Sequence, residues 1–226
     1  MARKRQKNKR SLTEYTTKEL SSISRPASTI EEKEIILIYC EGKNTEPSCF
    51  LQFELVTAEI KSLGEGKNTK TLVQKAITLS KKRDYDQVWC VFDMDEHGMQ
   101  NFNDAVRIAE QNNIGVAYSN QAFEYWLILH FEDHQGGKMN RKIYNKKINK
   151  YINPLKASYN GSKTKIIDDN FFDLLRGTDE RTQESREELA IKRAKKIYSR
   201  YNHLSPGKEE SSTTVFRLVE EIKKYL

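Results

Sequence analysis

The sequence predicts an α/β protein in which helices flank a parallel β-sheet, with a basic helical appendage attached. Two observations predict this class. Short, continuously apolar segments alternate along the chain with longer amphipathic segments, and the composition becomes basic and tyrosine-rich after His134. A strand covered on both faces is apolar throughout, and strands separated by helices pair in parallel. With 226 residues, the chain is long enough for one domain and a smaller appendage.

The predicted elements of the sheet domain follow one another from residue 34 to residue 131. Runs rich in Ile and Val predict buried strands, and apolar residues spaced three or four apart predict helices. The sequence predicts strands at 34–40, 87–93 and 114–119, helices at 45–60, 69–83, 101–113 and 122–131, and a loop at 64–69. The apolar stripes of the first three helices are Phe50, Phe53, Leu55 and Ile60, then Leu72, Ala76 and Leu79, then Phe102, Val106 and Ala109. The helix at 122–131 is apolar on nearly every side, so we expect it to be buried.

The composition of the chain changes after His134. From Lys138 to Lys165 there are nine Lys or Arg residues and no Asp or Glu, and residues 186–201 predict a basic amphipathic helix. Residues 212–226 predict a closing helix capped by Ser212 or Thr213. We therefore expect a basic disordered tail and linker at 1–33, a sheet domain at 34–134, a basic helical appendage at 135–200, and a C-terminal helix at 201–226 that packs back on the sheet domain.

The charge of the chain is concentrated at its start. The formal net charge is +7, and without the six basic residues among the first ten, 33 basic residues remain against 32 acidic ones. Such a tail either keeps a protein in solution or attaches it to nucleic acid. The three cysteines form no CxxC pair, so neither a disulfide framework nor a zinc site is expected. The apolar runs are too short to span a membrane and no signal peptide is recognisable, which favours the cytoplasm.

Acidic residues follow two of the predicted strands directly. Glu41 follows the first strand, and Asp93 and Asp95 end the second. Ligands of a parallel sheet bind beyond the carboxyl ends of its strands, and alternation would point Asp93 and Asp95 to the same side. Converging carboxylates repel one another unless a cation lies between them, and Mg²⁺ prefers oxygen ligands. The alternative is that these are ordinary loop acids that cap a helix.

Two further residues extend this hypothesis. Glu124 lies within the apolar helix at 122–131, where a carboxylate needs a metal or a charge partner such as Arg or Lys. His97 follows Asp95 closely and could shuttle a proton or position a water, or simply be solvated in a loop. The chain has no GxxxxGK[ST] motif and no GxGxxG after a strand, which argues against a P-loop nucleotide hydrolase and a dinucleotide-dependent redox enzyme.

Five sequence blocks resemble, in order, the signature blocks of the RloB-like (AbiLii-type) family. They are IYCEGKNTEPSCF, VWCVFDMDEH, SNQAFEYWLILHF, AIKRAKKI and STTVFRLVE. The resemblance covers most of the chain from about residue 34 onward. It implies a TOPRIM/Rossmann-like fold related to the OLD-type nucleases, and a place in antiviral, abortive-infection defence beside a partner ATPase.

The resemblance also implies site residues. The strand-end Glu and the D-x-D pair of TOPRIM proteins match Glu41, Asp93 and Asp95, and two further acidic family positions match Glu46 and Glu124. These five would hold one or two Mg²⁺ ions, or Mn²⁺. Lys43 would stabilise transition-state charge, or be a solvated loop lysine. This chain departs from the family at Gln121, where Pro is usual, and at Cys49, where Tyr is usual.

The leading hypothesis is therefore a magnesium-dependent endonuclease switched on by an ATPase, with the basic appendage binding the substrate. Interleaved Tyr144, Tyr151 and Tyr159 would stack on bases, which favours RNA over DNA and makes tRNA one plausible target. The expected nucleic-acid contacts are Lys138, Arg141, Lys142, Lys146, Lys147, Lys150, Tyr151, Arg193 and Lys196. The alternatives are a non-catalytic nucleic-acid-binding adaptor of a defence ATPase, and a nucleotidyl or phosphoryl transferase. A homo-oligomer is compatible with each of these hypotheses.

Overall fold

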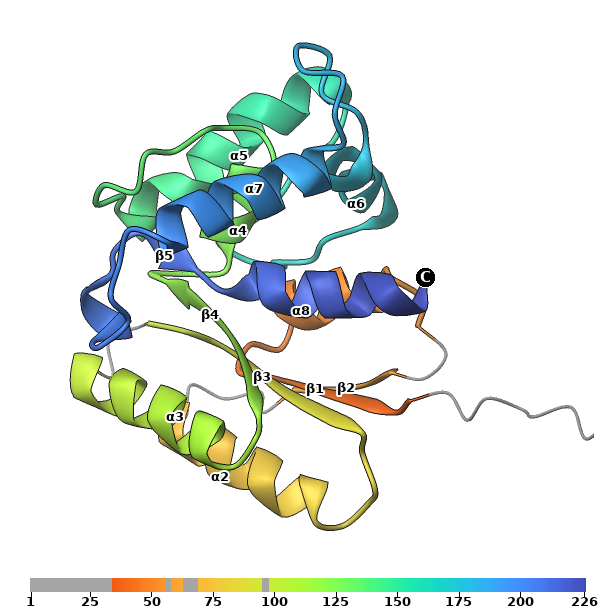
Figure 1. The fold of residues 1–226 in the computed structure, drawn as a ribbon. Coiled ribbons are helices and arrows are strands. Elements are labelled where there is room, and N and C mark those ends of the chain that lie inside the picture. Colours follow the sequence, from red (N-terminus) through yellow and green to blue (C-terminus); the bar gives the residue numbers. More distant parts are fainter. Residues whose placement is uncertain (1–33, 56–57, 63–68, 95–97) are drawn as a thin grey trace, which may run out of the picture. The chain divides into compact units, whose positions relative to one another are not determined.

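A five-stranded, mostly parallel sheet organises the protein (Figure 1). The structure is a computed structural model and describes residues 34–55, 58–62, 69–94 and 98–226. The strands are β1 (Ile36–Cys40), β2 (Ala58–Ser62), β3 (Gln87–Asp93), β4 (Gly115–Asn120) and β5 (Ser212–Thr213). They lie in the order β2-β1-β3-β4-β5, and only β5 runs antiparallel, against β4. The mixed α/β class predicted from the sequence is confirmed.

Eight α-helices accompany these strands in the described residues. They are α1 (Thr45–Leu51), α2 (Thr69–Ser80), α3 (Met99–Gln111), α4 (Glu124–Leu129), α5 (Tyr144–Ile152), α6 (Asp169–Arg176), α7 (Arg186–Tyr198) and α8 (Val215–Ile222). In Figure 1, α2 and α3 cover one face of the sheet, and α8 lies over the other, with α4, α5 and α7 beyond it. No helix among the described residues combines the length and the apolar character needed to cross a membrane.

Side-chain alternation along β1 divides the core between the two faces of the sheet. Leu37 and Tyr39 pack with α2 and α3, whereas Ile36, Ile38 and Cys40 pack with the helices of the other face. Strand β3 alternates in the same way, with Cys90 and Phe92 facing α2 and α3 and Val91 facing the other side. Because both faces are covered, these strands are apolar throughout, as the sequence suggested.

The helix predicted at 45–60 is wrong in its second half. Helix α1 ends at Leu51, and Ala58–Ser62 form the edge strand β2, which pairs with β1. Glu54 has a positive φ of 52°, a conformation that no helix can contain. The apolar residues of this segment matched a helical stripe because β2 contributes only Ile60 to the core, and one residue carries no alternating pattern.

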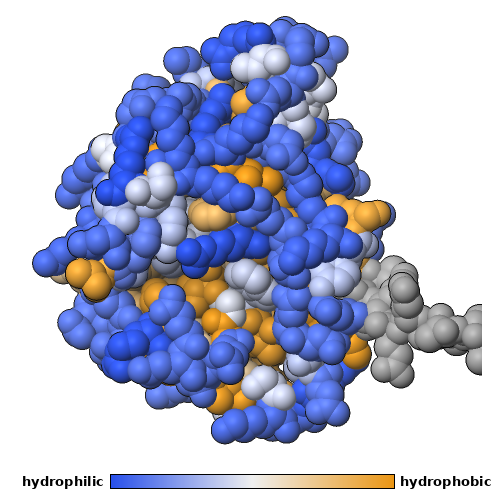
Figure 2. Space-filling model, in the orientation of Figure 1, coloured by the Kyte–Doolittle hydropathy of each residue, from blue (hydrophilic) through white to orange (hydrophobic). Residues whose placement is uncertain are grey.

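The start of the last helix also differs from the prediction. Ser212 and Thr213, expected as caps, form β5 and pair with Asn120 and Ser119, and the helix begins at Val215. The region from Glu34 to Leu226 is one compact unit. Its division at residue 134 stays a prediction, and the tail at 1–33 lies outside the described residues. Figure 2 shows hydrophilic residues over most of the visible face, with apolar residues in the band between α3 and α8.

Candidate functional site

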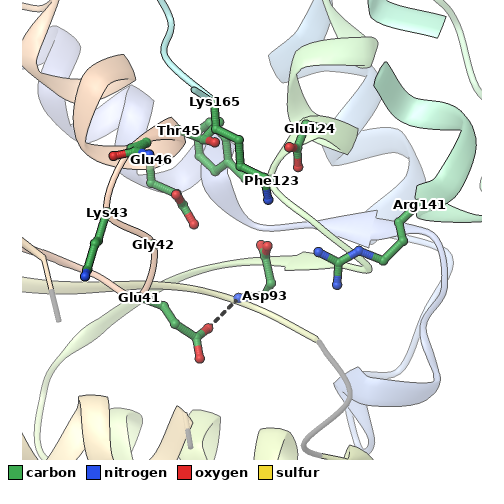
Figure 3. A pocket seen from close by; sticks show the side chains of 11 residues that line it. Glu41, Gly42, Lys43, Thr45, Glu46, Asp93, Phe123, Glu124, Arg141 and Lys165 are labelled. Atoms are coloured by element: carbon green, nitrogen blue, oxygen red, sulfur yellow. Dashed lines mark hydrogen bonds between the residues drawn. The ribbon is translucent and has the colours of Figure 1, made fainter. Parts of the chain in front are cut away.

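Glu41 and Asp93 meet at the carboxyl edge of the sheet. Strands β1 and β3 are parallel neighbours, with Cys40 in register with Val91, so the residues that follow lie side by side. Glu41 Oε2 accepts a hydrogen bond of 3.2 Å from the backbone N–H of Asp93 (Figure 3). By alternation along β3, Asp93 faces the side of the sheet away from α2 and α3. The predicted convergence of these two strand ends is therefore present.

Glu46 and Glu124 reach the same edge from the first turns of α1 and α4. Both are buried, at 5% and 9% exposure. The Glu46 carboxylate packs against Gly42, where any side chain would collide with it, so the absence of a Cβ makes room for the acid. Glu124 Oε1 accepts a hydrogen bond of 2.9 Å from the Tyr159 hydroxyl, which is also bonded to Thr45 Oγ1 at 3.2 Å. Each carboxylate is thus held by its local structure.

These four acids line one pocket of about 280 Å³. Its lining consists of Glu41, Gly42, Lys43, Asn44, Thr45, Glu46, Asp93, Phe123, Glu124, Arg141 and Lys165. In Figure 3 the Lys165 side chain reaches in among the carboxylates of Asp93, Glu46 and Glu124, and the guanidinium of Arg141 faces Asp93. The pocket therefore brings carboxylates and cations together, with the Lys165 ammonium among three of the acids and Arg141 beside Asp93.

The crowding of the acids helps to raise the pKa values of two of them. Burial, followed by the charges of Glu46, Glu124 and Glu41, holds the pKa of Asp93 well above its usual range, and Arg141 opposes the effect. Burial and the charge of Glu124 raise the pKa of Glu46 to about 7, against backbone hydrogen bonds and Lys165. A bound cation would remove this repulsion, because it compensates the negative charge that burial makes costly.

The donor chemistry fits a hard divalent ion, since every candidate ligand is a carboxylate oxygen. Among the described residues, no three His, Cys, Asp or Glu side chains already stand in a metal-binding arrangement. Asp95 and His97, which the sequence analysis assigned to this site, lie outside the described residues. The acids that would hold the ion within the described part are Glu41, Asp93, Glu46 and Glu124.

The predicted basic residues are divided by the structure into two groups. Lys43 lines the pocket but is exposed and points away from the three gathered carboxylates in Figure 3. Arg141, predicted to contact nucleic acid, is exposed and lines the pocket. Lys138, Lys142, Lys146, Lys150 and Lys196 are exposed, although Lys138 and Lys196 pair with Glu210 and Asp133 at 3.7 Å and 3.6 Å.

Three of the side chains predicted to contact nucleic acid are bonded to other residues of the protein. Arg193 is buried and donates a hydrogen bond of 2.7 Å to the carbonyl of Leu129. Lys147 pairs with Glu132 at 2.6 Å, and Tyr151 donates to the same carboxylate at 2.6 Å. The Tyr151 ring also stacks on Phe131, with ring centres 5.6 Å apart. These contacts give the three side chains structural roles, which the basic composition of the segment concealed.

The tyrosines expected to stack on bases are likewise packed inside. Tyr144 and Tyr159 are 2% and 3% exposed, so neither offers a face to a nucleobase. Tyr159 and Lys165 were not predicted as parts of the site. The stretch without acids from 138 to 165 signalled positive charge, but nothing in it indicated that its end returns to the edge of the sheet.

Comparison with known proteins gives one match. A family model described as RloB-like protein matches residues 36–222. No curated protein and no solved structure matches the chain. The matched segment contains Glu41, Glu46, Asp93 and Glu124, together with the pocket cations Arg141 and Lys165. The chain belongs to the RloB-like family.

Proposed function

We propose that this protein is a divalent-metal-dependent nuclease that hydrolyses phosphodiester bonds in nucleic acid. The observation that supports this most is one pocket at the carboxyl edge of a parallel sheet in which carboxylates face cations. The carboxylates that line the pocket are Glu41, Asp93, Glu46 and Glu124, and in Figure 3 the cations Arg141 and Lys165 lie beside the last three, whereas Glu41 points away from them. Phosphoryl transfer needs these two kinds of group together, because a metal and a phosphate must be held side by side.

The side chains of the pocket would share the work as follows. The four carboxylates would hold Mg²⁺ or Mn²⁺, which supplies polarisation of a phosphoryl oxygen and a more acidic water when bound. Tyr159 keeps Glu124 oriented through its hydrogen bond of 2.9 Å, and the backbone of Asp93 keeps Glu41 oriented. A relation to TOPRIM nucleases is part of the proposal, and the acids at the ends of β1 and β3 support it.

Exposed lysines on and beside α5 support the binding of a polyanion. Tyr144 and Tyr159 are buried, and one face of the partly buried Tyr151 ring is stacked on Phe131, so these tyrosines do not favour RNA over DNA, and both stand as competing substrates. The resemblance supports a role in antiphage abortive infection with a partner ATPase, which would supply the trigger.

The test uses the purified full chain with end-labelled RNA and DNA, each single-stranded and duplex. Reactions contain EDTA, Mg²⁺ or Mn²⁺, with and without a candidate partner ATPase. We expect cleavage that needs the metal and disappears in Asp93→Asn. Cleavage that persists in this variant would assign the activity to a contaminant. Metal-independent binding without cleavage under any condition would instead support the adaptor, and a joined or nucleotide-extended product would support a transferase.

A further inference from the structure

Arg141 and Lys165 enter the carboxylate pocket from outside the elements that carry the acids. Arg141 begins the short 3-10 turn Arg141–Ile143 before α5, and Lys165 lies in the loop that precedes α6. Both line the pocket and lower the pKa of an acid in it, Asp93 for Arg141 and Glu46 for Lys165. Among the described residues, neither side-chain head group takes part in an ion pair, so both charges are available to a ligand.

The backbone at both positions is held in place by hydrogen bonds. The N–H of Arg141 donates to Gln121 Oε1 at 2.8 Å, and the next N–H, of Lys142, donates to Asn140 Oδ1 at 2.9 Å. The N–H of Lys165 donates to the Asn160 carbonyl at 2.9 Å. Fixed backbones aim the two cations at the cavity, and this arrangement suits a ligand that arrives later.

Two cations beside a carboxylate cluster have an electrostatic cost for metal binding. A positive charge in the pocket opposes the approach of a second positive charge, so Arg141 and Lys165 weaken a site built only for a metal. An anion that binds together with the metal reverses this effect, because it is attracted by both. Within the part of the chain that the structure describes, Phe123 is the only aromatic residue lining the pocket, and at 1% exposure it offers no face for a base to stack on.

We propose that Arg141 and Lys165 form the phosphate-binding part of the site and hold the non-bridging oxygens of the substrate phosphate beside the carboxylates. The proposal rests on the nuclease function and adds its anion subsite. The cavity of about 280 Å³ has room for a phosphate group and a partly hydrated ion, since it equals about nine water volumes. The guanidinium suits paired oxygens, whereas the ammonium acts as a point charge.

The test compares Arg141→Gln and Lys165→Gln with Lys163→Gln, which removes the same charge from an exposed lysine in the same loop, outside the pocket. Two quantities are measured by calorimetry on the full chain: the affinity for Mg²⁺ alone, and the affinity for inorganic phosphate at saturating Mg²⁺. We expect both pocket variants to bind Mg²⁺ about threefold more tightly than wild type, because a repelling charge is gone. We expect them to bind phosphate at least about tenfold more weakly.

Turnover gives a third reading when cleavage is present. We expect kcat to fall at least about 100-fold in either pocket variant, as for other groups that stabilise transition-state charge. Arg141→Lys and Lys165→Arg should restore the wild-type affinity for Mg²⁺ and part of the phosphate binding. Tighter binding of Mg²⁺ together with weaker binding of phosphate would exclude a merely structural role, because structural damage would weaken the binding of both ligands.

Pocket variants whose affinities for Mg²⁺ and phosphate match those of Lys163→Gln would overturn the proposal. So would a loss of both affinities together. If wild type cleaves no nucleic acid, but the pocket variants bind Mg²⁺ more tightly and phosphate more weakly than wild type, the nuclease function is refuted and the anion subsite stands. If wild type cleaves nucleic acid and both pocket variants keep its kcat, the nuclease function stands and the anion subsite is refuted.

Discussion

The carboxylate of Glu41 is bonded to the backbone of Asp93, with 3.2 Å between Oε2 and the amide nitrogen. The acid that follows one strand is thus oriented by the last residue of the neighbouring strand. This contact depends only on the backbone at position 93, so it survives any change of that side chain. The charge of Asp93 can therefore be removed without releasing Glu41, which makes Asp93 the most informative acid to alter.

Asp93→Asn should abolish metal-dependent cleavage and leave the metal-free fold intact or slightly more stable. The change keeps the shape of the side chain and removes a charge that burial and three neighbouring acids make unfavourable. We expect activity to fall at least about 100-fold, and the melting temperature in EDTA to stay equal or rise. Mg²⁺ should raise the melting temperature of wild type more than that of the variant. A large drop of the melting temperature in EDTA would show that Asp93 is structural.

Tyr159→Phe should weaken both the fold and the reaction. The variant loses the hydroxyl that donates to Glu124 at 2.9 Å inside the protein, and such bonds to charged groups contribute about 1.5–3 kcal/mol. We expect a comparable loss in the free energy of unfolding and a shift of the Mg²⁺ dependence of cleavage to higher concentration.

Tyr85→Phe is the matched control, because its hydroxyl also donates to a carboxylate, that of Glu59, away from the pocket. It should lower stability without moving the Mg²⁺ dependence. An equal shift in both variants would mean that Tyr159 acts only through overall stability.

The lysines of α5 should separate into binding and structural residues. Lys146 and Lys150 are exposed, whereas Lys147 is paired with Glu132 at 2.6 Å. Lys146→Ala with Lys150→Ala should flatten the slope of log affinity against log salt by about 0.7 to 0.9 for each lost phosphate contact. Lys147→Ala should leave the slope unchanged. An unchanged slope in the double variant would show that this face of α5 does not bind nucleic acid.

Tyr151→Ala should lower stability and leave affinity for nucleic acid nearly unchanged. The ring stacks on Phe131 and the hydroxyl donates to Glu132, so truncation opens a gap in the core and removes a hydrogen bond. Because the ring is only partly buried, we expect a loss of about 1–3 kcal/mol in the free energy of unfolding. Thermal melting and binding titrations on the same preparation decide the matter, because weaker binding of single strands at wild-type stability would assign the ring to base stacking.

The sequence predicted the acidic half of the candidate site more fully than the basic half, for physical reasons. Glu41 and Asp93 directly follow buried strands, and parallel pairing alone brings such positions together. Glu124 was conspicuous because its neighbours are apolar. Lys165 and Tyr159 reach the site through the path of a loop, which depends on side-chain bonds such as that between Asn149 and the backbone of Tyr159. No periodic pattern records such bonds.

The same distinction explains the errors in the fold. Strands β1, β3 and β4 were predicted because a strand that is buried on both faces has a continuously apolar sequence. Strand β2 lies at the edge and β5 has two residues, so their pairing leaves almost no trace in composition. Their places are set by the neighbouring strands β1 and β4.

His130 predicts how stability depends on pH. Burial lowers the pKa of this histidine from 6.5 to about 3, and the charges of Arg193 and Arg186 add to the effect, against hydrogen bonds that the ring makes to the backbone of α4. Its Nδ1 lies 3.0 Å from the carbonyl oxygen of Trp126 and, as the protonated nitrogen of the neutral ring, donates to it. The folded protein therefore keeps the ring neutral at pH values where the unfolded chain already binds a proton.

Because the unfolded state binds more protons between pH 6.5 and 3, His130 makes the free energy of unfolding fall as the pH decreases through this range. Its contribution has a slope of at most about 1.4 kcal/mol per pH unit. His130→Asn keeps a donor for the Trp126 carbonyl but cannot titrate, so its stability should fall less steeply on acidification. Urea unfolding at pH 7.5, 6, 5 and 4 measures both proteins. We expect the difference in free energy of unfolding between wild type and variant to be constant above pH 7 and to shrink below pH 6. If the free energies of the two proteins change in parallel down to pH 4, His130 is not held neutral by the fold.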